Sequence, residues 1–160
     1  NNNNNNNNLL AMVLRLTALV GCVGVLLARA GQRLQVLNDQ SFEHETQAST
    51  GGTTGSWLVT FGEGRCTSCS EVRDALELAD EELRSAYTIP ALVDRADSAG
   101  LWKRFGIREV PTTLFIGKGK MVRYTGQSKD ASDFVNFVNN ALEAWTVGEK
   151  VPPEPSMVDK

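Results

Sequence analysis

The alternation of apolar and polar residues divides most of the chain into short strands and amphipathic helices. Alternating or β-branched runs predict strands, whereas apolar residues three and four positions apart predict one face of a helix. Strands are expected at residues 34–37, 57–61, 89–93, 111–116 and 121–124. Helices are expected to start within residues 38–43, at the cysteine pair, at residue 98 and near Asp130, with Gly106 ending the third.

The two longest predicted helices carry clear apolar stripes. One stripe consists of Val72, Leu76, Ala79 and Leu83, at spacings of four, three and four. The other consists of Phe134, Phe137 or Val138, Leu142 and Trp145. Such stripes are typical of helices that pack on a core. Polar residues before the first stripe, from Thr67 to Glu71, suit a helix N-terminus because they cap it and match its dipole.

The order of elements predicts an α/β fold with a central mixed β-sheet flanked by helices. The early strands alternate with helices, so right-handed parallel crossovers are expected. The last two strands are joined by Gly117-Lys118-Gly119-Lys120, which is typical of an antiparallel hairpin. This domain is expected to span residues 34–147. Residues 148–160, with three prolines in four positions, are expected to be a disordered tail.

The chain before the domain has a different composition. Residues 1–8 are all asparagine and form a low-complexity tract. Residues 9–28 contain a single charge, Arg15, and are long enough for a transmembrane helix. The region 9–30 also fits a signal peptide, with Ala28-Arg29-Ala30 as its cleavage signal. Both interpretations place the rest of the chain on the exported side of a membrane, in the endoplasmic reticulum lumen, the secretory pathway or another organelle lumen.

Composition and charge narrow the chemistry further. The formal net charge of the 160 residues is -3, and no basic stripe indicates binding to nucleic acid. Of three cysteines, Cys22 lies alone in the apolar run, so a disulfide-rich mini-protein is excluded. The one histidine, His44, is far from the other two cysteines in sequence. Since a structural zinc ion needs four ligands, no metal site is expected.

Cys66 and Cys69 form a CxxC motif between a predicted strand and a predicted helix. At a helix N-terminus the first sulfur lies beside unpaired amide groups and the positive end of the helix dipole, which stabilise a thiolate. Arg65 adds a cation next to it. Cys69 can reach back to close a disulfide or to resolve a mixed one. A static disulfide or two idle thiols remain as alternatives.

The surrounding segments resemble the thioredoxin superfamily, and most closely one catalytic domain of the protein disulfide isomerase family. The resemblance lies in VLNDQSFEHETQASTGGTTGSWLVTF, in CTSC and in RFGIREVPTTLFIGKGKMVRYTG. It implies a thioredoxin fold, Cys66 as the attacking and Cys69 as the resolving cysteine, and protein thiols as clients. It further implies a cis-proline at Pro111 that binds substrate together with Val110. The redox-active disulfide would then replace any cofactor.

Several residues depart from the family pattern. Arg65 replaces an aromatic residue, and Thr67-Ser68 replace Gly-His. The family's histidine would help to stabilise the first thiolate, so its absence should make the cysteine pair less oxidising than that of an isomerase. Thr60 stands where many members keep a buried acid, and a hydroxyl cannot serve as that base. Glu63 is a candidate to substitute for it.

Two functions are therefore compared. The first is a thiol–disulfide oxidoreductase, which the retained CxxC favours. The second is a membrane-tethered accessory subunit of a membrane complex with little redox turnover, which the departures and the apolar segment favour.

Overall fold

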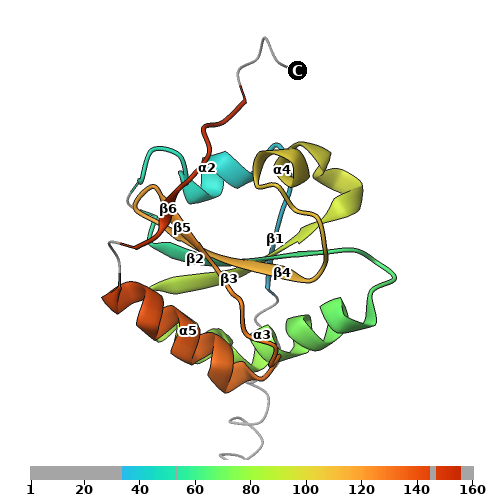
Figure 1. Ribbon diagram of the computed structural model, residues 1–160, viewed down its shortest axis with the longest axis vertical. Coiled ribbons are helices and arrows are strands. Elements are labelled where there is room, and N and C mark those ends of the chain that lie inside the picture. Colours follow the sequence, from blue (N-terminus) through green and yellow to red (C-terminus); the bar gives the residue numbers. More distant parts are fainter. Residues whose placement is uncertain (1–33, 53, 145–146, 156–160) are drawn as a thin grey trace, which may run out of the picture. The chain divides into compact units, whose positions relative to one another are not determined.

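The computed structural model describes residues 34–52, 54–144 and 147–155 (Figure 1). The predicted asparagine tract and the predicted apolar segment 9–30 lie outside the described residues, as does Trp145 of the last apolar stripe. Within the described ranges, no helix is both long and apolar enough to cross a membrane.

The described elements follow the predicted order. They are β1 (Gln35–Leu37), α2 (Phe42–Thr46), β2 (Ser56–Gly62), α3 (Thr67–Ser85), β3 (Thr88–Asp94), the 3-10 turn η1 (Arg95–Asp97), α4 (Ala99–Arg104), β4 (Thr112–Gly117), β5 (Lys120–Arg123), α5 (Ala131–Glu143) and β6 (Glu149–Lys150). The predicted strands and helices are confirmed, whereas η1 and β6 were not foreseen.

All six strands form one mixed sheet in the order β1-β3-β2-β4-β5-β6. Strand β3 pairs in parallel with both β1 and β2, while β4, β5 and β6 join in antiparallel fashion. Helices α2 and α4 cover one face of the sheet, and α3 and α5 cover the other (Figure 1). The predicted mixed α/β architecture is therefore confirmed.

The sheet separates two apolar layers. Toward α2 and α4, the rings of Phe42, Phe61, Trp102 and Phe105 pack on one another with centroids 5.2–5.7 Å apart. Toward α3 and α5, the buried side chains include Leu58, Phe115, Phe134 and the whole predicted stripe of α3. Burying one such side chain contributes about 1.5–3 kcal/mol, so these layers fix both β2 and α3, between which the chain carries the cysteines.

The β4–β5 hairpin has a two-residue turn. Gly117 pairs with Lys120, and the residues between them, Lys118 and Gly119, have φ angles of 41° and 77°. Two consecutive positive φ angles define the turn class whose twist matches that of paired strands. The glycine adopts this conformation without the penalty that a Cβ imposes.

The expectation of a disordered tail from residue 148 onward is wrong for residues 149–152. Strand β6 pairs with the edge of β5, and Val151 is buried. Beyond it, Arg104 donates two hydrogen bonds to the carbonyl of Pro152. Prolines favour an extended chain, and an extended chain also fits against an open sheet edge, so composition alone did not reveal this packing.

Candidate active site

The two cysteines lie where the central strand β2 runs into α3. Cys66 is the N-cap residue of α3, with extended backbone angles, and Cys69 lies in the first turn of the helix. The two are joined by a disulfide with Cα atoms 5.1 Å apart. The strand fixes the position of this turn because β2 is almost entirely buried between its neighbours β3 and β4.

The two sulfur atoms have different surroundings. The Cys66 sulfur accepts a hydrogen bond from the Cys69 backbone N–H at 3.0 Å and thereby caps the helix. Cys66 is only half-buried, whereas Cys69 is 6% exposed. An amide donor and solvent access both favour a reactive thiolate at Cys66 once the disulfide is reduced. The geometry therefore distinguishes an outer sulfur from an inner one.

Pro111 lies at the same end of the sheet as the cysteines. The register pairs Phe61 with Thr112, so Gly62 and Pro111 are the next residues on adjacent strands. Gly62 packs against Cys69, because a Cβ at Gly62 would lie 3.4 Å from the Cys69 sulfur. The Val110–Pro111 bond is cis, which confirms that prediction. Both residues are half-buried and so remain accessible at this end of the sheet.

A pair of threonines occupies the sheet behind the disulfide. Thr60 on β2 and Thr113 on β4 face each other across the strand pair, and their hydroxyl oxygens are 2.8 Å apart. Thr60 is 2% exposed and Thr113 is 4% exposed. The hydroxyl of Thr60 thus has a partner and does not ionise near neutral pH, so no buried acid occupies this position.

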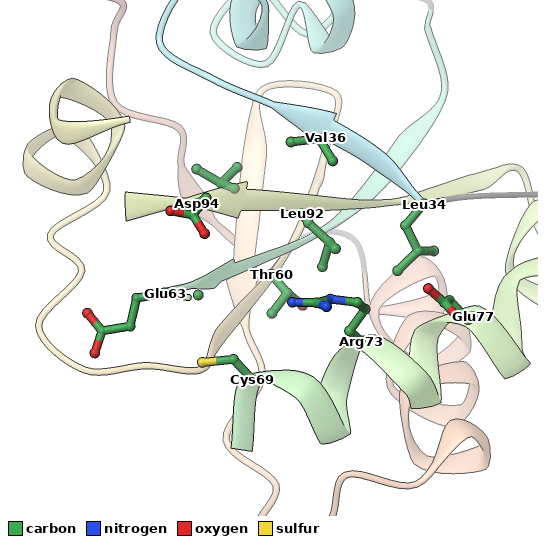
Figure 2. Close-up of a pocket in the computed structure, with 11 residues that line it drawn as sticks. Leu34, Val36, Thr60, Glu63, Cys69, Arg73, Glu77, Leu92 and Asp94 are labelled. Carbon is green, nitrogen blue, oxygen red and sulfur yellow. The ribbon is translucent and has the colours of Figure 1, made fainter. Parts of the chain in front are cut away.

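An open pocket of about 360 Å³ reaches the inner sulfur from the β1 side of the sheet. Figure 2 shows Cys69 and Glu63 at one end of this pocket and Leu34 and Glu77 at the other. Strand β3 adds Leu92 and Asp94, and Thr60 forms part of the wall. The pocket gives solvent a route to a cysteine that is otherwise buried.

The remaining predicted modulators, Glu63 and Arg65, lie in the loop between β2 and α3. Glu63 lines the pocket and forms an ion pair with Arg95, with 3.5 Å between nitrogen and oxygen. The Glu63 side chain is 43% exposed, so it is a solvated group that nevertheless faces the inner cysteine's pocket. Arg65 is exposed in the loop before Cys66 and does not line the pocket. His44 is exposed on α2, and no group of three metal-ligating side chains occurs among the residues described here.

Two residues of this site were missed from the sequence. Thr113 follows the cis-proline by two positions, and only the register of β2 with β4 shows that it meets Thr60. Arg73 lines the pocket from α3. Its spacing of four residues from Cys69 was the available signal, because such residues share one face of a helix.

Comparison with known proteins supports the same assignment. The Thioredoxin family model matches residues 33–140. A thioredoxin domain-containing protein of Theileria parva is 38% identical over 119 residues, which is 74% of this chain and 53% of that protein. Thioredoxin-related transmembrane protein 1 of Bos taurus is 29% identical over 86 residues, or 54% of this chain and 31% of that protein. This chain therefore spans about half or less of the length of these relatives.

Two solved structures have a similar fold. The J-Trx1 fragment of ERdj5 has a TM-score of 0.57 at 17% identity, over 69% of this chain and 52% of that one. The zinc-bound form of human ERp44 has a TM-score of 0.58 at 16% identity, over 68% of this chain and 30% of that one. At these identities the likeness establishes the fold.

Proposed function

Because this chain belongs to the thioredoxin family, we propose that it is a thiol–disulfide oxidoreductase that acts on the cysteines of client proteins. One observation carries the proposal. Cys66 is half-buried and its sulfur caps α3, whereas its disulfide partner Cys69 is buried, and exchange chemistry needs this asymmetry.

In the reducing direction the reaction starts from the dithiol form. The Cys66 thiolate attacks one sulfur of a client disulfide, so a mixed disulfide forms and the other client sulfur leaves as a thiolate. Cys69 then loses its proton and attacks the Cys66 sulfur. The first client sulfur leaves, the Cys66–Cys69 disulfide forms, and two electrons have passed to the client. The oxidising direction is the reverse of these steps.

Clients would bind over the end of the sheet that carries Val110 and Pro111. The register of β2 with β4 brings Pro111 beside Gly62 at the end of β2, and Gly62 packs against Cys69. An extended client segment could pair with the Val110 backbone while its sulfur reaches Cys66. We assign catalytic roles to Cys66 and Cys69 and substrate binding to Val110 and Pro111. Arg65, Glu63 and Thr60 would modulate the reactivity of the two thiols.

We place this activity on the exported side of a membrane, in the endoplasmic reticulum lumen or secretory pathway. The apolar segment 9–28 supports this location as a cleaved signal or as an anchor. The partners would be proteins with reactive thiols or disulfides. A net charge of -3 without a basic patch in the sequence argues against nucleic acid as a partner.

The test is to trap clients with single-cysteine variants of the full chain. Reduced Cys69→Ser should form a lasting mixed disulfide with a disulfide-bonded model protein such as insulin, because no resolving thiol remains. Cys66→Ser is the matched control and should trap nothing. With dithiothreitol as the reductant, insulin should be reduced faster when the wild-type chain is present than with dithiothreitol alone. Non-reducing gels and the turbidity of reduced insulin measure both effects.

The environment of Thr60 favours a second candidate function. The Thr60 hydroxyl is hydrogen-bonded to that of Thr113, so no buried acid lies behind the inner cysteine. A membrane-tethered accessory subunit of a larger membrane complex would not need one. If Cys69→Ser traps no client and the wild-type chain gives only the dithiothreitol rate, the enzyme proposal fails. Normal assembly of the double variant lacking both cysteines would then support the accessory role.

A further inference from the structure

The resolving step requires that buried Cys69 lose a proton. In the reduced protein this thiol would lie beside Gly62 and near the bonded pair of Thr60 and Thr113. Neither threonine can accept the proton as a base at neutral pH. Burial disfavours a thiolate, so some other group must stabilise the charged form for exchange to proceed at a useful rate.

Arg73 is placed to do this. It lies one helical turn after Cys69 on α3, so both side chains project from the same face of the helix. Both line the pocket, and Figure 2 shows the Arg73 guanidinium extending from α3 toward Thr60, on the side where Cys69 lies. Among the residues that the structure describes, none forms a hydrogen bond or an ion pair with Arg73, so no described side chain neutralises its charge by direct contact.

The other charged groups of the pocket are carboxylates. Glu63 lies in the loop after β2 and pairs with Arg95. Asp94, at the end of β3, accepts a hydrogen bond from the Ala96 backbone N–H at 2.9 Å. Glu77 is exposed at the far end of the pocket (Figure 2). β1 contributes only apolar side chains to the pocket. Arg73 is therefore the single cation among the described residues that line it.

We propose that Arg73 is a positioning residue whose cation stabilises the Cys69 thiolate on the same wall of the pocket and so permits resolution without a buried acid. This inference rests on the proposed redox function. The proton of Cys69 leaves to solvent through the pocket, and the Cys69 electron pair then forms the bond to Cys66 while the client thiolate departs. Arg73 neither gives nor takes a proton in this step.

The first measurement follows the Cys69 thiol directly. The full chain carrying Cys22→Ala and Cys66→Ser keeps Cys69 as its only thiol. Thiolate absorbance at 240 nm against pH then gives the Cys69 pKa in detergent solution. Adding Arg73→Gln should raise this pKa and reduce the thiolate fraction at pH 7 by roughly 3- to 10-fold, since Arg73 is exposed and its field is partly screened. The difference should shrink in 1 M salt.

Two controls separate charge from structure. Arg73→Lys keeps the cation, so the Cys69 pKa should stay close to its value in the chain that carries only Cys22→Ala and Cys66→Ser. Lys103→Gln removes an exposed cation from α4, across the sheet, and should leave the Cys69 pKa unchanged. The inference is overturned if Arg73→Gln leaves the Cys69 pKa the same as in the chain that carries only Cys22→Ala and Cys66→Ser. It is also overturned if Arg73→Lys raises the Cys69 pKa as much as Arg73→Gln does, because the effect would then not depend on charge.

The second measurement follows resolution itself. In the chain with both cysteines, Arg73→Gln should slow the decay of the client mixed disulfide by 3- to 10-fold at pH 7. The rates should converge at high pH, where Cys69 is ionised in both proteins. A rate unchanged by Arg73→Gln at pH 7 refutes the role of Arg73 even while exchange continues. If no client exchanges at all, the proposed function fails, and the Cys69 pKa still decides the effect of Arg73.

Discussion

Replacing Arg104 by methionine should strongly destabilise the fold, because the charge of this residue is buried and paired. Arg104 is on α4, and its side chain is 3% exposed. Its Nη2 lies 2.8 Å from the Glu43 Oε2 on α2, and its Nε and Nη2 donate to the Pro152 carbonyl at 3.0 and 2.8 Å. The guanidinium also lies 5.1 Å from the centre of the Phe105 ring. One side chain thus joins two helices and the C-terminal segment.

The expected loss follows from what the substitution leaves behind. Removing one partner of a buried ion pair costs about 3–5 kcal/mol, mainly because the other charge is stranded. Glu43 keeps its hydrogen bonds from the Ser49 backbone and hydroxyl, and its side chain is 17% exposed. These contacts reduce the cost of leaving the Glu43 charge without Arg104, so we expect Arg104→Met to lower the free energy of unfolding by about 3 kcal/mol. Glu43→Gln should cost only about 1–2 kcal/mol, since Arg104 retains the Pro152 carbonyl.

The pH dependence gives an independent check. Burial by itself raises the pKa of Glu43, but the hydrogen bonds from Ser49 and the charge of Arg104 outweigh it, and the net pKa lies below the ordinary 4.5. A carboxyl whose pKa is lowered by folding contributes stability above its unfolded pKa and loses it as the pH falls through the folded pKa. Without Arg104 this contribution shrinks. The stability gap between wild type and Arg104→Met should therefore narrow below about pH 4.5.

Urea unfolding of the oxidised proteins, from pH 7 down to pH 3.5, measures these differences. The matched variant is the double substitution Arg104→Met with Glu43→Gln, which removes the stranded charge and should cost less than the sum of the singles. A loss below 1 kcal/mol for Arg104→Met at pH 7, or a gap that does not change with pH, would refute the reasoning.

Three further predictions concern the sheet and its edges. Thr60→Val or Thr113→Val alone should each cost about 1–3 kcal/mol, because the remaining buried hydroxyl loses its partner; the double variant should cost less than the two singles together, as a double-mutant cycle would show. Val151→Ala should cost about 1–3 kcal/mol in urea unfolding if β6 and its flank pack as described, and close to nothing if this segment is free in solution. Gly119→Ala should lower stability by about 1 kcal/mol or more, since φ there is +77°, and an unchanged melting temperature would argue against this turn.

The candidate site shows which of its features a local sequence pattern can predict. The CxxC spacing between a strand and a helix was enough to predict that Cys66 would lie at the N-terminus of α3 and Cys69 further into the helix. The capping role was expected from the polar residues between Thr67 and Glu71, whereas the structure gives it to the Cys66 sulfur. The cis bond before Pro111 was predicted from family resemblance, since cis X-Pro bonds make up only about 5–6% of such bonds in folded proteins. Thr60 was singled out as a departure from the pattern, yet its partner Thr113, 53 residues away, was not.

The sequence by itself determined the elements and their order, because the apolar periods of strands and helices are local and strong. It also placed two cysteines within reach of each other at the start of a helix, since only two residues lie between them. Only the tertiary structure decided which distant residues share a site. The strand register brings Thr113 to Thr60 and Pro111 to the end of β2, and the open corner of the sheet beside β1 brings Leu92 and Asp94 to the pocket that Cys69 lines. The docking of residues 149–152 was hidden for the same reason. A short polar and proline-containing segment gains its order from an unpaired sheet edge and from Arg104, and neither partner is adjacent to it in the chain.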